Sequence, residues 1–341
     1  MFRIRRLVPA LLVAALAGTL PACAGDGDEV DASKLVIYSG RQENLVGDLI
    51  EGFEKDSGIK VSVRYGNTAQ LAAQLMEEGE RTKADVYLSQ DGGALGALAK
   101  AKMLTTLPQP VLEKVPAQYR AKDGTWVGTS GRARVIVYDP KQVPEADVPD
   151  SVFELTDPKW KGKVGIAPSN ASFESFVTAI RVLKGDEVAR KWLKDMKAND
   201  VETYDNNIAI LNATKKGVLK LGLINHYYWY EQVAEEGKDK VPARLKFLPG
   251  GDPGALVNVA GVGILDGSDH ADEARKFAEY LLSEKGQKYF ADRTKEYPLV
   301  AGVPTAKDLP ALDTLQNPDI DLSDLDTLEQ TLTMIEDAGL T

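Results

Sequence analysis

Two adjacent tyrosines lie in the stretch of sequence whose residue types most clearly suggest chemistry. Tyr227 and Tyr228 belong to LINHYYWY, residues 223–230, where an apolar strand-like run passes into a helical pattern. Neighbouring strand residues point to opposite faces, so two tyrosines that share a ligand must lie where the strand ends and the helix begins. Phenolate is a hard, anionic oxygen donor, and a trivalent cation can displace its proton although the free pKa is about 10. The pair could therefore bind such a cation; the alternative is aromatic packing with the hydroxyls at a rim.

Two phenolates leave one positive charge on a trivalent ion, which an anion bound beside it could neutralise. Candidate anion-binding side chains occur at predicted strand ends and loops: Arg41, Ser169, Asn170, Ser172, Asn207 and Asn225. A guanidinium presents a two-pronged fork to a planar oxyanion, and free N–H groups at a helix start favour an anion. The alternatives are a solvated loop arginine for Arg41 and plain N-capping for the serines and asparagines. Arg132 is expected either behind the site or in a salt bridge between lobes.

The elements that must position these residues follow a βαβ rhythm. Short apolar stretches alternate with helical ones, and they are residues 34–40, 60–66, 84–90, 163–169, 201–206, 219–228 and 244–251. The stretches at 131–140 and 255–264 are expected to cross between two lobes. We predict an α/β fold of two lobes, each a mixed, mostly parallel sheet flanked by helices. Lobe one would hold 34–130 plus 262–341, and lobe two 131–261.

The candidate side chains fall at the carboxyl ends of the predicted strands. Arg41 and Gln42 follow the first strand, Gln90 ends the third, and the tyrosines end a later one. Ligands in open α/β sheets lie outside these strand ends, so we expect a ligand cleft between the lobes.

The first residues have the layout of a secretory signal. Three arginines precede an apolar run from Leu7 to Leu20, which is shorter than the roughly 20 residues of a spanning helix. We predict a signal peptide over residues 1–22. Cys23, the only cysteine, follows Leu-Pro-Ala in an arrangement similar to a bacterial lipobox, so we expect it to be lipidated. The alternative is an ordinary cleaved signal. Residues 23–33 are polar and predict a flexible tether.

Charge and motif content exclude several functions. The net charge is −10, and it becomes −13 without the leader, which carries three arginines and no acidic residue. An acidic surface argues against nucleic acid as a partner. The sequence has two histidines and lacks the nucleophile-elbow, zinc-protease, P-loop and dinucleotide motifs, so we expect no enzyme, although a secreted enzyme stays as a distant alternative.

Several segments together resemble one family, the bacterial ferric-ion-binding proteins or periplasmic transferrin-like proteins. They are YSGRQENL, ADVYLSQ, TSGRARVIVYDP, PSNASFES, NHYYWY and EYPLVAGV. The resemblance implies a monomer that closes around one Fe3+ as cargo, with Tyr227 and Tyr228 as ligands beside a synergistic carbonate or phosphate. It also implies delivery to an ABC permease with a cytoplasmic ATPase. The protein would be periplasmic or lipid-anchored to the outer face of the cytoplasmic membrane.

Two positions depart from the pattern of that family. Gln42 stands where many members have histidine, and Gln90 where they have glutamate. An amide oxygen is a weaker ligand than imidazole or carboxylate, so these glutamines either touch the metal weakly or bind its anion and water. His226 precedes the pair and is expected to point away from Tyr227. A binder of a phosphonate or another small oxyanion on the same fold is the alternative function.

Overall fold

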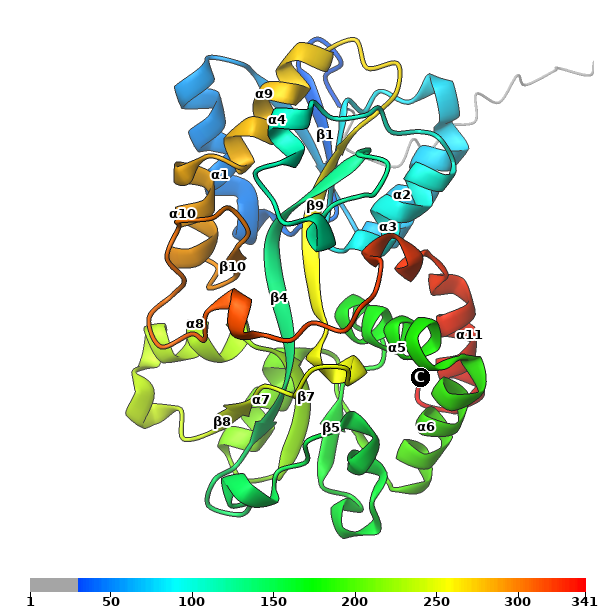
Figure 1. Ribbon diagram of the computed structural model, residues 1–341, viewed down its shortest axis with the longest axis vertical. Coiled ribbons are helices and arrows are strands. Elements are labelled where there is room, and N and C mark those ends of the chain that lie inside the picture. Colours follow the sequence, from blue (N-terminus) through cyan, green and yellow to red (C-terminus); the bar gives the residue numbers. More distant parts are fainter. Residues whose placement is uncertain (1–29) are drawn as a thin grey trace, which may run out of the picture.

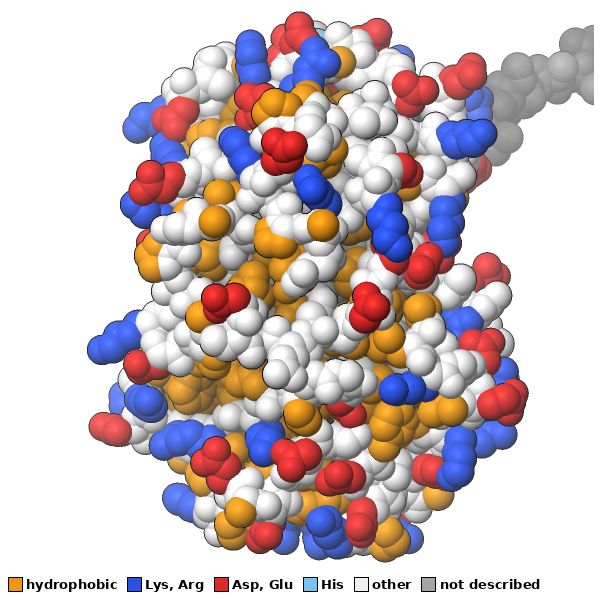
Figure 2. Space-filling view, in the orientation of Figure 1, with side chains coloured by type: hydrophobic (Ala, Val, Ile, Leu, Met, Phe, Trp, Pro, Cys, Tyr) orange, Lys and Arg blue, Asp and Glu red, His pale blue; other side chains and the backbone are white. Residues whose placement is uncertain are grey.

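The computed structural model describes residues 30–341, so the predicted leader, Cys23 and most of the predicted tether lie outside the described residues. The molecule has two α/β lobes stacked along its longest axis, joined by two long strands (Figure 1). Within the described part, no helix is long and apolar enough to cross a membrane. Figure 2 shows acidic and basic side chains interspersed on both lobes of the drawn face, with apolar side chains gathered around the waist.

Lobe one is built on parallel strands that begin near the N-terminus. β1 pairs in parallel with β2 and β3, and the return strand β9 pairs antiparallel with β3. Its strands are β1 (Leu35–Ser39), β2 (Val61–Tyr65), β3 (Val86–Ser89) and β10 (Tyr297–Pro298). Its helices are α1 (Glu43–Ser57), α2 (Thr68–Glu78), α3 (Gly92–Lys100), α4 (Gln109–Leu112), α9 (Ala271–Leu281) and α10 (Glu284–Asp292).

Helix α1 illustrates why these segments form helices. Val46, Leu49, Ile50 and Phe53 recur at helical spacing and all are buried, so the helix has one apolar face for the sheet. It ends at Gly58, whose φ of 74° is accessible to glycine at little cost. Its start follows β1 directly, which places the intervening loop at the carboxyl edge of the sheet.

Lobe two repeats the arrangement with its own core. β5 pairs in parallel with β6 and β7, while β4 pairs antiparallel with β7 and β8. Its strands are β5 (Val164–Ile166), β6 (Glu202–Thr203), β7 (Leu221–Asn225) and β8 (Arg244–Lys246). Its helices are α5 (Ala171–Lys184), α6 (Asp186–Ala198), α7 (Asn207–Lys215) and α8 (Tyr227–Glu236).

The two lobes are connected by β4 (Trp126–Tyr138) and β9 (Val257–Ile264). β4 pairs with β9 as far as Ala133 and with β7 from Arg134 onward, so it changes its partner sheet between these two residues. β4 begins at Trp126, five residues before the predicted crossing at 131–140. Its first residues, Trp126 and Val127, are fully buried and belong to the sheet of lobe one.

The C-terminal segment corrects the predicted lobe boundary. We expected residues 262–341 to belong to lobe one, but α11 (Leu328–Asp337) packs on α5 and α6 of lobe two (Figure 1). Met334 and Ile335 belong to the lobe-two core, and Arg181 of α5 donates to the Thr327 carbonyl at 2.7 Å. The apolar face of α11 completes the core of lobe two, so the end of the chain lies on lobe two and not on lobe one.

Candidate functional site

The two tyrosines lie at the junction of a strand and a helix, as the sequence analysis expects. β7 ends at Asn225, and His226 already has helical angles of φ −57° and ψ −40°. The strand alternation stops there, so Tyr227 and Tyr228 face the same cleft with ring centroids 4.1 Å apart and planes inclined by 32°. Tyr227 is 2% exposed and Tyr228 is half-buried. Two phenol oxygens are therefore presented side by side to one space.

The cleft between the lobes has a volume of about 590 Å³. It is lined by tyrosines and polar groups from both lobes, among them Arg41, Gln42, Asn67, Thr68, Gln90, Ser169, Asn170, Ser172, Tyr227 and Tyr228. Most of the candidate residues are thus brought together around the tyrosine pair. Asn207 is not part of this lining, and Asn225 borders a smaller hollow near Arg132 and Arg134.

Burial raises the pKa of both tyrosines. The pKa of Tyr227 lies well above its usual value because the phenol is desolvated and because Tyr228 is next to it. Desolvation likewise raises the pKa of Tyr228. Both groups are neutral phenols near neutral pH unless a cation displaces their protons. Among residues 30–341, no group of three or more His, Cys, Asp or Glu side chains is placed to hold a metal ion. A metal in this cleft would therefore depend on the phenols.

Arg41 is engaged by a carboxylate that the sequence analysis did not single out. Its Nη1 and Nη2 atoms donate to the two carboxylate oxygens of Glu296 at 2.8 Å each, and both side chains are 1% exposed. The fork that we predicted for a bound oxyanion is thus occupied by Glu296 in this structure. The Nε of Arg41 has no hydrogen-bond partner in the described chain.

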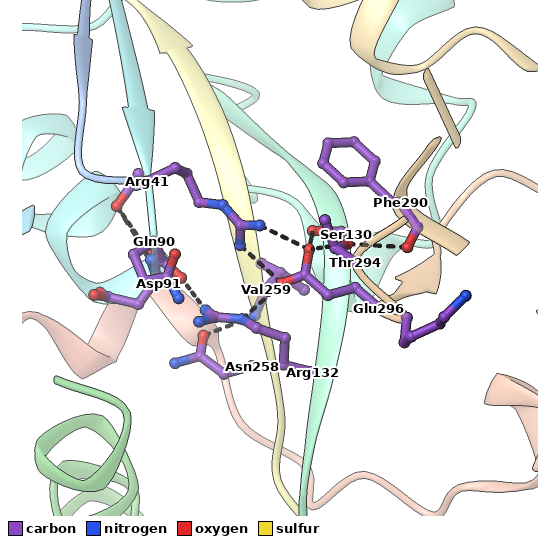
Figure 3. A network of polar contacts seen from close by, with 12 residues as sticks. Arg41, Gln90, Asp91, Ser130, Arg132, Asn258, Val259, Phe290, Thr294 and Glu296 are labelled. Atoms are coloured by element: carbon purple, nitrogen blue, oxygen red, sulfur yellow. Dashed lines mark hydrogen bonds and ion pairs between the residues drawn. The ribbon is translucent and has the colours of Figure 1, made fainter. Parts of the chain in front are cut away.

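Glu296 is the centre of a buried polar network at the edge of the cleft (Figure 3). Its Oε2 accepts hydrogen bonds from the hydroxyls of Ser130 and Thr294 at 3.0 Å each, and Arg132 Nε lies 3.8 Å from its Oε1. Burial alone would raise the pKa of this carboxyl, but Arg41 and Arg132 hold it below its ordinary value. The only sequence signal for this role was a lone glutamate before the apolar run YPLV.

Arg132 and Arg134 stand two residues apart on one face of β4, where the strand changes lobes. Arg132 Nη2 donates to the Gln90 carbonyl of lobe one, and Arg134 Nη2 donates to the Ser172 carbonyl of lobe two. Each arginine therefore contacts the backbone of a different lobe. Arg132 thus contacts Gln90 and lies near Glu296 on the side of lobe one. Arg134 was missed because one arginine of an alternating strand looks like any other.

These arginines leave positive charge near the tyrosines. Arg134 is 4% exposed, stacks at 5.4 Å over the Phe176 ring, and has no carboxylate partner in the described chain. Desolvation lowers its pKa to about 9. The Nε and Nη1 atoms of Arg132 also lack hydrogen-bond partners among the described residues. Arg41 and Arg132 adjoin Glu296, whereas Arg134 adjoins no described carboxylate, so buried positive charge remains that favours a bound anion.

The start of α5 is held by capping bonds. Asn170 Oδ1 accepts from the Ser172 backbone N–H at 3.1 Å, from the Ser172 hydroxyl at 2.6 Å and from Asn207 Nδ2 at 3.1 Å. The capping alternative therefore describes Asn170, while Ser169 and Ser172 still line the cleft. Asn207 accepts from the backbone N–H of Asn225 at 3.2 Å, so it ties α7 to the end of β7. These asparagines hold the starts of α5 and α7 next to the end of β7, after which the two tyrosines begin α8.

His226 has a structural position. Its Nδ1 accepts from the Ala133 N–H at 3.1 Å, which leaves Nε2 to donate to the Lys295 carbonyl at 3.0 Å. Burial lowers its pKa to about 4, so the ring stays neutral. With both nitrogens occupied, His226 links lobe one to the start of α8 and has no free electron pair for a metal.

Glu231 is a second acidic residue near the site that the sequence analysis did not identify. It lies on α8, lines a hollow of about 750 Å³ together with both tyrosines, and is half-buried. Desolvation, followed by the charge of Glu296, raises its pKa to about 7. Its distance of three and four residues from the tyrosines along a helix was a signal that could have found it.

Two α/β lobes that enclose a polar cleft and are joined by two crossing strands define a solute-binding protein of the kind that closes around its ligand. A model of the bacterial extracellular solute-binding proteins matches residues 81–324, and the chain belongs to this family.

Within this family, the chain is similar to proteins whose names describe the binding of iron. The chain is 34% identical over 340 residues to the Fe(3+)-binding periplasmic protein of Serratia marcescens, which covers 99% of each chain. It is similar to iron-bound HitA of Pseudomonas aeruginosa, with 35% identity, a TM-score of 0.83, and coverage of 89% of this chain and 99% of that one. A Trichodesmium protein in complex with iron and citrate has 28% identity, a TM-score of 0.78, and coverage of 90% and 99%. The predicted resemblance to ferric-ion-binding proteins and the predicted α/β fold are confirmed, as is the expectation of a binding protein rather than an enzyme.

Proposed function

We propose that this chain binds one Fe3+ between its lobes through the phenolate oxygens of Tyr227 and Tyr228 and carries it to an ABC permease. The observation that carries the proposal is the pair of rings 4.1 Å apart on one wall of the cleft. Packing alone does not require two phenol hydroxyls to face the same polar space. The names of the relatives, which describe ferric-iron binding, support the same cargo.

An anion completes the site in this proposal. Fe3+ with two phenolates keeps one positive charge, and Arg132 and Arg134 add buried charge that no described carboxylate fully offsets. Carbonate or phosphate at the start of α5, near Ser169 and Ser172, would offset the charge left on Fe3+ and the charge of the two arginines. Gln42 and Gln90 line the same cleft and supply amide groups to the anion, to water or weakly to the metal.

Transport follows from closure and release. The lobes close about β4 and β9 around the loaded site, and the closed form docks as a monomer on the permease, whose cytoplasmic ATPase drives release. Lipidation of Cys23 would keep the carrier at the outer face of the cytoplasmic membrane. Acylation is tested by mass spectrometry of the mature N-terminus from cells, with a Cys23→Ser variant as the control.

A titration tests iron binding directly. Metal-free protein receives ferric citrate, with and without bicarbonate or phosphate, while a tyrosinate-to-iron charge-transfer band is followed in the visible spectrum. We expect a band that saturates at one equivalent and disappears in the Tyr227→Phe, Tyr228→Phe double variant. Tyr230→Phe is the matched control, because the Tyr230 hydroxyl on the same helix donates to the Asp308 carbonyl at 2.9 Å and is not part of the cleft lining.

A metal-free oxyanion is the second candidate ligand. The observation that favours it is Arg134, a buried cation without a carboxylate partner in the described chain. Calorimetry of metal-free protein with a small phosphonate separates the two candidates. Tight phosphonate binding that survives the double tyrosine substitution, together with no iron band, would replace the iron proposal.

A further inference from the structure

Glu231 stands one helical turn after the tyrosine pair. It follows Tyr228 by three residues and Tyr227 by four on α8, so the three side chains share one face of the helix. Side chains on a helix lean toward its N-terminus, and this directs Glu231 back toward the phenols. The three residues line the same hollow, which confirms that they border a common space.

Glu231 lines a hollow that residues of lobe one also line, and it has no ion-pair partner among them. Thr294 and Lys295 of lobe one line the same hollow, and Glu296, Arg41, Lys295 and Glu235 act electrostatically on the carboxyl of Glu231. Arg41 is already bound to Glu296 in a two-bond ion pair. Glu231 itself forms no ion pair or hydrogen bond with the described residues. A half-buried carboxylate without a cation costs free energy unless a cation joins it.

We infer that Glu231 is a third protein ligand of the metal, which it binds through a carboxylate oxygen beside the two phenolates. This inference rests on the proposed iron-binding function and adds to it a ligand outside the tyrosine pair and the strand-end positions.

Chemistry of the site favours such a ligand. Carboxylate oxygen is a hard, anionic donor of the same kind as phenolate, whereas Gln42 and Gln90 offer only neutral amides. Two phenolates and one carboxylate carry three negative charges, which match a trivalent ion, so the proposed anion would offset the buried charge of Arg132 and Arg134. The carboxylate comes from the same helix as the phenols, so lobe two by itself would hold the metal before closure.

Glu231→Gln tests the inference, with Glu235→Gln as the matched control. Glu235 is also on α8 and borders the same hollow, but it is exposed and lies two turns from the tyrosines. Release of iron to excess EDTA is timed through decay of the charge-transfer band. We expect Glu231→Gln to release iron at least about tenfold faster than the parent, and Glu235→Gln to behave as the parent.

An infrared difference spectrum between metal-free and iron-loaded protein gives the direct signature. Ligation shifts the carboxylate stretching bands, and we expect this shift in the parent and the Glu235→Gln variant but not in Glu231→Gln. Unchanged iron release would overturn the inference, and so would a carboxylate shift that persists in Glu231→Gln loaded with phosphate and free of citrate and carbonate. Absence of a charge-transfer band in the parent would instead refute the proposed iron site, so the two failures are distinguishable. Equal circular dichroism of the metal-free variants shows that folding is intact.

Discussion

Arg41 and Glu296 form a buried two-bond ion pair although 255 residues separate them in the sequence. Both contacts measure 2.8 Å, and neither side chain is more than 1% exposed. The pair joins the loop after β1 to the segment before β10, directly beside the cleft. An arginine that the sequence offers to a ligand is thus part of the framework behind the ligand site.

Removing the carboxylate should destabilise the protein strongly. Glu296→Gln removes the carboxylate that Arg41 and Arg132 share in the protein interior, and breaking a buried pair in this way costs about 3–5 kcal/mol. Urea unfolding of the metal-free protein measures the loss. Asp48→Asn breaks the exposed pair with Arg293 and should cost less than about 1 kcal/mol. An equal decrease in the free energy of unfolding for the two variants would show that the buried ion pair does not stabilise the protein more than the exposed one.

Iron affinity should fall with acidity. Burial raises the pKa of Tyr227 and Tyr228, so both phenols hold their protons in the metal-free protein, and iron must displace two. Protons then compete with iron, and the affinity should drop by up to about a hundredfold for each unit of decreasing pH. Chelator competition between pH 8 and pH 5 measures this. An affinity that stays constant over that range would contradict tyrosinate ligation.

Arg134 should govern the response to the anion. Arg134→Gln removes a buried positive charge beside the Ser172 end of the cleft and keeps a side chain that can hydrogen-bond. We expect added bicarbonate or phosphate to strengthen iron binding by parent protein but at least about tenfold less in the variant, with the charge-transfer band retained.

Arg244→Gln is the control for that experiment, since Arg244 on β8 donates to carbonyls of residues 241–243 and does not line the cleft. An anion response that is the same in Arg134→Gln and the parent would place the anion elsewhere.

Helix α11 should contribute to the stability of lobe two. Ile335 is fully buried in the lobe-two core, and Ile335→Ala should lower the free energy of unfolding by about 2–5 kcal/mol. Leu332 is on the same helix but 36% exposed, so Leu332→Ala should change it by about 0.5 kcal/mol or less. Denaturant unfolding of metal-free protein compares the two. A small effect of Ile335→Ala would mean that the chain end is only loosely attached to lobe two.

The sequence predicted those parts of the site that depend on residues close together in the chain. The apolar run before Tyr227 and the helical pattern after Tyr228 are local signals, and together they place two phenols on one side of a strand end. The βαβ rhythm likewise follows from hydrophobic spacing within each element. The same locality makes Gln42 and Gln90 visible as cleft residues, since each directly follows a strand.

Contacts between distant segments were decided only by the tertiary structure. The sequence marks Arg41, Arg132 and Arg134 as cations, but the pairing of Arg41 with Glu296 and the different lobes held by Arg132 and Arg134 depend on how strands β4 and β10 meet. The placement of α11 on lobe two has the same origin. Hydrophobic patterning says which face of a segment is buried, whereas the partner that buries it is chosen by the whole packed core.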